Sequence, residues 1–380
     1  MASESLLPLV ESRRVIVCAG AGGVGKTTVA AALALGAAMR GRRVLCLTID
    51  PAKRLADTLG LRQLGPEPEV VAPERLAALG LDVSGSLSVL MIDTKSTFDE
   101  IVSRNAPTPE ARDRILKNRL YGYVSTSLAG TQSYMAMEKV LAVKSDPRFD
   151  LIVLDTPPTS DALDFLNAPE RLIEALDSPA MRWLVEAFTS SGKFSLNVLA
   201  RGVATLLRSV GKLTGTGFLE NMAEFVSELN DLFGGFKERA RQVSTAFRGS
   251  EFAYAIVTSP ARPALAEARF FVARLSELGM HGDAIVINRV NPTPRERPAP
   301  GDLARALAER GLAPELSPSV LRAFDEEGRQ GERDARALLL FSEDIAKVAR
   351  SNPPTIRIPM LAGDVHDLAT LRTIAERLVS

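Results

Sequence analysis

A glycine-rich stretch begins at Cys18 and carries a recognisable loop motif. It reads CAGAGGVGKTT, and it lies between an apolar run and a run with helical spacing. From Gly20 the pattern is a glycine, four residues and then Gly25, Lys26 and Thr27, which is the P-loop pattern between a strand and a helix. Glycines let backbone N–H groups turn toward phosphate oxygens, and the positive end of the following helix points at the same place. The stretch therefore predicts a loop that holds phosphates.

The residue types in this loop favour a nucleoside triphosphate. Lys26 is predicted to bring a cation to the phosphates, and Thr27 to offer its hydroxyl to Mg²⁺. Gly20, Gly22 and Gly25 also spell a dinucleotide fingerprint, with Asp50 as its acidic residue, but that fold needs neither a cation nor a hydroxyl here. A dinucleotide site and a chance match remain the alternatives. The predicted phosphate-binding residues are Gly20, Gly22, Gly23, Val24, Gly25, Lys26, Thr27 and Thr28.

Two further apolar runs end in a carboxylate. Residues 43–49 precede Asp50, and the run that starts at Phe149 closes on Asp155. Because ligands bind at the carboxyl ends of parallel strands, Asp50 is predicted to orient the attacking water or to hold Mg²⁺ through water, with a helix N-cap as the alternative. Asp155 has the Walker-B position. The predicted catalytic residues are thus Asp50 and Lys26, and the predicted metal ligands are Thr27, Asp50 and Asp155.

The order of predicted elements indicates an α/β fold, a P-loop domain with a mostly parallel central sheet flanked by helices. Strand-like and helix-like runs alternate on both sides of a long helical block, so we expect that block to be an insertion in one domain spanning residues 1–380. The helical subdomain would come from about residues 97–145 and 167–250, and residues 291–300 form a proline-rich connection. Further strands are predicted at 87–92, 252–258, 284–288 and 355–358, and helices at 264–278, 301–350 and 367–378, with 301–350 as a solvated face.

The helical block carries two apolar stripes. One covers residues 218–247 and the other residues 198–213, with a Thr-Gly-Thr-Gly hinge between them. The stripes either pack on each other or leave part of an apolar face open for a hydrophobic client helix. Both interpretations stay open at this point.

Composition limits the remaining function classes. Lys and Arg number 46 and Asp and Glu number 46, so no whole-protein basic footprint for nucleic acid is expected. Residues 1–14 do not resemble a leader, and no apolar run is long enough to span a bilayer, which predicts a cytoplasmic protein. Cys18 and Cys46 are expected to be buried hydrophobes, and His281 and His366 have no Cys or His nearby, so no transition-metal site is predicted.

Five motifs follow one another along the chain. They are the loop GAGGVGKTT, Asp50-Pro-Ala with Leu55-Ala-Asp57, Asp155-Thr-Pro-Pro-Thr159, the strand ending Val286-Ile-Asn288 and the ending Ile358-Pro-Met-Leu361. This series resembles the arsenite-pump and tail-anchored-protein-targeting ATPase family, which belongs to the deviant-Walker-A class of P-loop proteins. The similarity is greatest to bacterial members described only as anion-transporting ATPases.

The resemblance implies a dimeric ATPase that binds ATP and Mg²⁺ at its interface and carries its client function on inserted helices. It implies that residues 22–28 bind phosphates and Mg²⁺, that Asp50 positions water and that Asp155 lies in a switch sensing the γ-phosphate. Asn288, Pro359 and Leu361 would hold adenine.

The chain departs from the family pattern at three places. Ala21 stands where the family has a signature lysine that crosses the dimer interface, which leaves cross-dimer catalysis and the strength of hydrolysis open. The second switch continues into Thr159-Ser-Asp161, where many relatives have glycine and histidine. Arsenite binding needs grouped thiolates and zinc-linked dimers need a cysteine pair. Two buried cysteines would provide neither, so arsenite transport is disfavoured and no zinc is expected.

We therefore expect a Mg²⁺-dependent ATPase that dimerises with itself or with a lysine-bearing paralogue. Its nucleotide state would control a helical subdomain that binds a hydrophobic polypeptide or membrane-protein client, as in chaperone-like targeting. One alternative is a nucleotide-gated binding protein with little or no turnover. Another is a partition-like or division-site-like ATPase that cycles on a membrane or DNA. The neutral net charge and the unremarkable last helix argue against this alternative.

Overall fold

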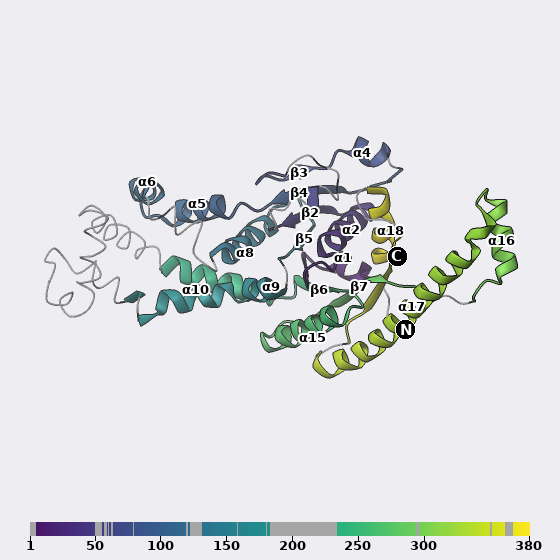
Figure 1. Ribbon diagram of the computed structural model, residues 1–380. Coiled ribbons are helices and arrows are strands. Elements are labelled where there is room, and N and C mark those ends of the chain that lie inside the picture. Colours follow the sequence, from purple (N-terminus) through teal and green to yellow (C-terminus); the bar gives the residue numbers. More distant parts are fainter. Residues whose placement is uncertain are drawn as a thin grey trace, which may run out of the picture. The chain divides into compact units, whose positions relative to one another are not determined.

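The computed structural model describes two compact units of the chain (Figure 1). The first comprises Met1–Met91, Pro147–Ala162 and Ser250–Ser380, and the second comprises Ile92–Asp146 and Leu163–Gly249. The described residues are 5–49, 55–56, 59, 61, 64–78, 80–118, 121, 131–157, 159–179, 181–182, 234–293, 296–349, 352–361 and 368–380.

An eight-stranded sheet forms the centre of the first unit, with the strand order β3-β4-β2-β5-β1-β6-β7-β8. Strand β3 pairs antiparallel with β4, and the other neighbouring strands are parallel. The predicted α/β fold with a mostly parallel sheet is confirmed. The strands are β1 (Val15–Gly20), β2 (Arg43–Thr48), β3 (Glu69–Val70), β4 (Ser86–Met91), β5 (Leu151–Asp155), β6 (Phe252–Thr258), β7 (Ala284–Val290) and β8 (Thr355–Pro359).

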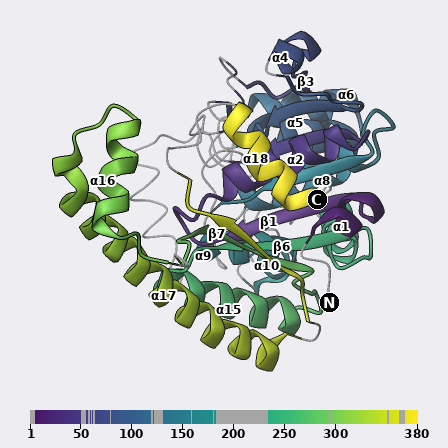
Figure 2. The same cartoon turned by 90° about the vertical axis from the view of Figure 1, so that its right-hand side faces the viewer.

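Helices cover both faces of this sheet, which is why the central strands read as unbroken apolar runs. Every residue of β1, β5 and β6 is buried. Helix α2 (Lys26–Met39) packs against α18 (Leu368–Val379), as Figure 2 shows, and Gly36 permits this approach because a Cβ there would lie 3.0 Å from the Val379 side chain. Helix α15 (Arg262–Glu277) contacts β1 and β6. Two short helices that the sequence pattern did not predict are α1 (Leu7–Ser12) and α4 (Pro73–Ala78).

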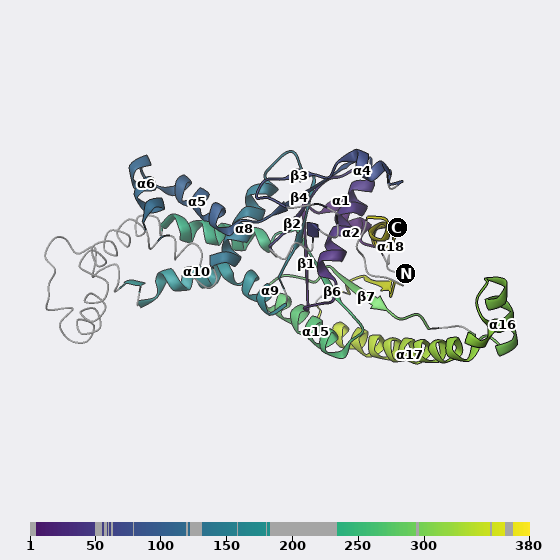
Figure 3. The same cartoon turned by 45° about the horizontal axis from the view of Figure 1, so that its top comes forward.

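The segment after β7 forms a helical arm of the first unit. It consists of α16 (Pro300–Glu309), the 3₁₀ turn η1 (Pro314–Leu316) and the 32-residue helix α17 (Ser317–Val348). Helix α17 contacts both α16 and α15, and Figure 3 shows α16 standing away from the sheet. The stretch predicted as one helix over 301–350 is helical, but it forms two helices separated by η1. Its predicted solvated character holds for one side of α17 only, because Leu338, Phe341 and Ile345 are buried.

The second unit is helical in its described part. It contains α5 (Thr94–Asn105), α6 (Pro109–Lys117), α8 (Thr131–Lys144), α10 (Ala168–Asp177) and a helix over residues 234–247, and α9 (Thr159–Leu166) runs into it from the first unit. Asp93 caps α5 and Thr108 caps α6, with Pro109 at the first position of that helix, so α5 and α6 are separate helices.

Aromatic side chains build the core of this unit. The ring of Phe98 lies 5.4 Å from that of Tyr121 and 6.0 Å from that of Phe236, and Phe165 meets Phe247 edge to face. The helical spacing predicted for residues 218–247 is confirmed where it is described, because Phe236, Ala240, Val243 and Phe247 form the buried face of the helix over 234–247. The predicted stripe at 198–213 and the hinge after it lie outside the described residues.

Candidate functional site

The glycine-rich loop lies between β1 and α2, at the carboxyl end of the central strand. Strand β1 ends at Gly20, and α2 begins at Lys26 with Gly25 as its N-cap residue. Gly23 has φ 77° and Gly25 has φ 91°, a left-handed conformation that glycine adopts without steric cost. No side chain among the described residues caps this end of α2, so its first N–H groups point into the loop as an anion-binding helix terminus does.

Two of the glycines also lie close to neighbouring strands. A Cβ at Gly20 would lie 1.9 Å from the carbonyl oxygen of Val257 in β6, and a Cβ at Gly25 would lie 2.3 Å from Nδ2 of Asn288 in β7. Larger residues would therefore fill the space in which the loop turns. Gly22 and Gly23 are exposed, so the outer part of the loop is open to a ligand.

Lys26 is buried at the start of α2, and its Nζ donates a 2.9 Å hydrogen bond to the carbonyl oxygen of Ala21. The side chain thus folds back over the loop and places its charge among the loop's backbone groups. Thr28 follows in the first turn of α2 and is half-buried.

Thr27 and Asp155 come together although 128 residues separate them. Oγ1 of Thr27 donates to Oδ2 of Asp155 at 2.8 Å, and Oγ1 of Thr48 at the end of β2 donates to the same oxygen at 3.2 Å. Asp155 is 1 % exposed at the end of β5. Hydroxyl and carboxylate oxygens are hard ligands of the kind Mg²⁺ prefers, so this donor set fits the metal that the sequence predicted. Thr48 was not predicted, although its place one residue before the end of the apolar run was a usable signal.

The end of β7 holds the loop from the other side. Nδ2 of Asn288 donates to the carbonyl oxygen of Val24 at 2.9 Å, and Nη1 of Arg289 donates to the carbonyl oxygen of Gly23 at 3.1 Å. Arg289 has φ 61°, which is uncommon for a residue with a Cβ and costs about 1–2 kcal/mol. Sequence reasoning missed Arg289, because an exposed arginine near the end of a strand carries no local signal of such a contact.

Pro359 and Leu361 lie at the end of β8, beside β7. The backbone N–H of Met360 between them donates to the carbonyl oxygen of Val290 at 2.9 Å. Both line a pocket of about 390 Å³ whose other lining residues are Val290, Pro292, Arg357, Ile358, Thr373, Ile374 and Arg377. Asn288 does not line this pocket, so the three residues predicted to hold adenine occupy two places on adjacent strands.

Some predicted positions cannot be compared with the structure. Asp50 and Asp57 lie outside the described residues, and so do the side chains of residues 159–161. The burial predicted for Cys18 and Cys46 is confirmed. Within the described ranges, no group of three His, Cys, Asp or Glu residues could hold a metal ion, and no helix has the length and apolar character needed to cross a bilayer.

Comparison with known proteins gives one consistent result. The family model described as "Anion-transporting ATPase" matches residues 13–302, about three quarters of the chain. An ATPase GET3 of Malassezia globosa is 25 % identical over 282 residues, which cover 74 % of this chain and 73 % of that protein. An ATPase get3 of Aspergillus terreus is 29 % identical over 222 residues, 58 % of this chain and 60 % of the relative.

A candidate arsenical pump-driving ATPase of Prosthecochloris vibrioformis is 26 % identical over 220 residues, 58 % of this chain and 49 % of that protein. This chain therefore spans only about half the length of that relative. The family match includes the loop, Asp155 and Asn288, and it ends within α16. Because the match covers most of the chain, including strands β1 to β7, the chain belongs to the anion-transporting ATPase family.

Proposed function

We propose that this protein is a Mg²⁺-dependent ATPase whose nucleotide lies against the loop of residues 20–28. The observation that carries the proposal is the convergence of Thr27 and Asp155 at the N-terminus of α2, directly behind a loop held open by left-handed glycines. Membership of an ATPase family supports it independently.

The described residues divide the work between charge and position. The N–H groups at the start of α2 and the Lys26 ammonium neutralise phosphate oxygens, and Lys26 exchanges the Ala21 carbonyl for a phosphate oxygen as its partner. Thr27 and Asp155 would hold Mg²⁺, which would neutralise charge that develops on the transferred phosphoryl group. Asp50 is proposed to orient the attacking water, in keeping with the family resemblance.

Asn288, Pro359 and Leu361 are proposed to hold the adenine end of the nucleotide. Their support is their place at the ends of β7 and β8, on the same edge of the sheet as the loop. Asn288 already fixes the Val24 carbonyl, so it would couple base binding to the shape of the loop.

The finer parts of the function rest on the family resemblance. We propose a cytoplasmic dimer, formed with itself or with a lysine-bearing paralogue because Ala21 replaces the signature lysine. The helical second unit, with the apolar stripe predicted at residues 198–213, would bind a hydrophobic polypeptide or membrane-protein client. Arsenite transport remains disfavoured because both thiols are buried in strands.

ATP hydrolysis by the purified protein tests the proposal. We expect Mg²⁺-dependent phosphate release that falls at least about tenfold in Lys26→Ala and in Asp50→Asn. Lys95→Ala is the matched control, because Lys95 lies on the surface of the second unit and pairs with Asp99. Wild-type activity in both loop and Asp50 variants would contradict the mechanism.

Ala21 favours one second candidate, a nucleotide-gated binding protein with little turnover. In that case the wild-type protein would bind ATP tightly and release no measurable phosphate, and Lys26→Ala would still abolish binding. A lysine restored at position 21 by Ala21→Lys would then be expected to raise turnover.

A further inference from the structure

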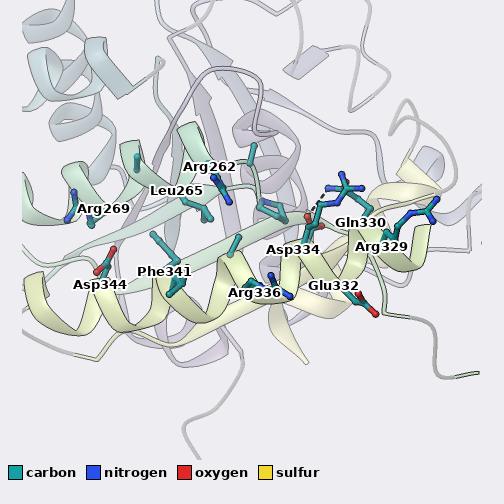
Figure 4. Close-up of a pocket in the computed structure, with 16 residues that line it drawn as sticks. Arg262, Leu265, Arg269, Arg329, Gln330, Glu332, Asp334, Arg336, Phe341 and Asp344 are labelled. Carbon is teal, nitrogen blue, oxygen red and sulfur yellow. Dashed lines mark hydrogen bonds between the residues drawn. The ribbon is translucent and has the colours of Figure 1, made fainter. Parts of the chain in front are cut away.

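A groove of about 910 Å³ runs between α15 and α17 in the first unit. Figure 4 shows Leu265 of α15 and Phe341 of α17 pointing toward each other between the two helices. Both side chains are buried, whereas Leu340 at the rim is 58 % exposed. The groove therefore has an apolar floor and an apolar edge open to solvent.

Arginines surround this floor. Arg262 and Arg269 project from α15 and Arg336 from α17, and all three are exposed. In the described part of the chain, no carboxylate lies within salt-bridge distance of any of the three.

The acidic residues of the groove are for the most part engaged elsewhere. Asp334 is buried and accepts hydrogen bonds from Asn291 and Gln330, and Asp344 pairs with Lys347. Arg329 and Arg333, at one end of the groove, pair with Glu326. The guanidinium groups of Arg262, Arg269 and Arg336 therefore have no carboxylate partner among the described residues. Together with the apolar floor, they make a surface complementary to an acidic ligand that has an apolar face.

The spacing of these groups matches a helical ligand. Arg262, Leu265 and Arg269 occupy positions i, i+3 and i+7 on one face of α15, so the two arginines lie about 10 Å apart along the helix axis. Arg336 and Leu340 are one turn apart on α17. A helix with leucines on one face and carboxylates beside them would satisfy both the floor and the arginines.

The second wall of the groove lies beyond the residues that match the family model. The match ends at residue 302, whereas α17 begins at Ser317. None of the residues that line the groove belongs to the loop of residues 20–28, so the groove is separate from the proposed nucleotide site.

We propose that the groove between α15 and α17 binds an acidic amphipathic helix of a partner protein. The leucine face of that helix packs on Leu265, Phe341 and Leu340, and its carboxylates pair with Arg262, Arg269 and Arg336. A polynucleotide is disfavoured because its phosphate backbone has no apolar face to cover Leu265, Phe341 and Leu340, whereas an amphipathic helix does.

Fluorescence anisotropy with a designed peptide tests the proposal on the full chain. The probe is a labelled helical peptide of about 18 residues, about 27 Å long, with leucine at helical spacing and glutamate beside it; a lysine analogue is its control. We expect saturable binding of the acidic peptide alone, weakened by salt. The charge reversals Arg262→Glu, Arg269→Glu and Arg336→Glu should each weaken it several-fold, and Leu340→Asp should weaken it as well.

Arg322→Glu is the matched control, since Arg322 is exposed on α17 and does not line the groove. Its affinity should equal that of the wild-type protein, and circular dichroism should show each variant folded. The proposal is overturned if the acidic peptide does not saturate, if Arg322→Glu weakens binding as much as the groove variants do, or if a single-stranded oligonucleotide binds more tightly and displaces the peptide.

Discussion

The hydroxyl of Thr27 donates a 2.8 Å hydrogen bond to Oδ2 of Asp155, and this contact joins the start of α2 to the end of β5. Asp155→Asn would keep an oxygen that can accept this bond but would remove the negative charge. We therefore expect a folded protein whose ATP affinity responds much less to Mg²⁺, because metal affinity falls by at least about tenfold. Isothermal titration with ATP in Mg²⁺ and in EDTA measures this difference.

Asp150→Asn is the control for that experiment, because Asp150 precedes the same strand at its opposite end and pairs with Arg43. It should leave the Mg²⁺ dependence of ATP binding unchanged. An Asp155→Asn protein that responds to Mg²⁺ as the wild type does would exclude Asp155 from the metal site.

The contact between the loop and β7 predicts an energetic coupling. Gly25→Ala would place its Cβ 2.3 Å from the Asn288 amide, while Gly23→Ala meets nothing within 4 Å and adds only the strain of a left-handed residue, about 1–2 kcal/mol. Gly25→Ala should therefore lower the free energy of unfolding less in the Asn288→Ala background than in the wild-type protein, because the shorter side chain removes the clash. Gly23→Ala should cost the same in both backgrounds. Urea unfolding of the double-mutant cycles checks this, and zero coupling at Gly25 would show that Asn288 moves away freely.

How far the sequence predicts this site depends on the distance along the chain over which each contact forms. The strand, glycine loop and helix around Lys26 follow from local pattern and residue type, so residues 15–39 could be predicted. Asn288 and Arg289 contact loop residues that lie 264 and 266 positions earlier, and only the order of β1, β6 and β7 in the sheet brings them there.

The α17 surface shows the same limit. Its many charged residues predicted a solvated helix, yet Leu338, Phe341 and Ile345 are buried. These three residues are spaced three and four positions apart, so they lie on one side of the helix. Periodicity indicates that a helix has an apolar side, but it does not say which element that side will contact. Strand β3 escaped prediction for another reason, since two exposed edge residues leave no alternating pattern.

The two cysteines should be inert in the folded protein. Burial raises the pKa of both thiols, and the neighbouring Asp155 carboxylate raises them further. At pH 8 they are therefore neutral thiols, which are poor nucleophiles and poor ligands for arsenite. A disulfide reagent should label both only after unfolding, and arsenite should leave ATP hydrolysis unchanged. Rapid labelling of the cysteines in the native protein, or stimulation of ATP hydrolysis by arsenite, would contradict this prediction and support a function linked to arsenite.

The ion pair between Arg43 and Asp150 predicts part of the acid sensitivity. Hydrogen bonding to the Arg43 guanidinium holds the pKa of Asp150 well below its usual range. Because the Asp150 pKa is lower in the folded than in the unfolded protein, the ion pair stabilises the fold fully at pH values above the unfolded-state pKa of about 4. This stabilisation is lost as the pH falls toward the folded-state pKa. Arg43→Met should thus lower the unfolding midpoint at pH 7, and its difference from wild type should shrink below about pH 4. Arg269→Met, which removes no ion pair in the described structure, should show no such convergence.

A buried carboxylate holds two helices of the second unit together. Glu138 of α8 is 4 % exposed, accepts a 2.8 Å hydrogen bond from Nε of Arg239 in the helix over 234–247, and also accepts one from the Tyr134 hydroxyl. Arg239→Met would leave a charge in an apolar setting, so we expect it to lower the free energy of unfolding by about 1–3 kcal/mol. Glu138→Gln should cost less, because an amide carries no charge that needs a partner.

The double variant Glu138→Leu with Arg239→Met decides whether this pair stabilises the unit or only avoids an unpaired charge. If the cost of Arg239→Met comes from the stranded carboxylate, removing that carboxylate too should recover part of the lost stability. Chemical denaturation, with amide exchange in the helix over 234–247 as the local probe, measures both effects. A double variant less stable than Arg239→Met alone would mean that Glu138 stabilises the unit mainly through its bond from Tyr134, and Tyr134→Phe should then be as costly as Arg239→Met.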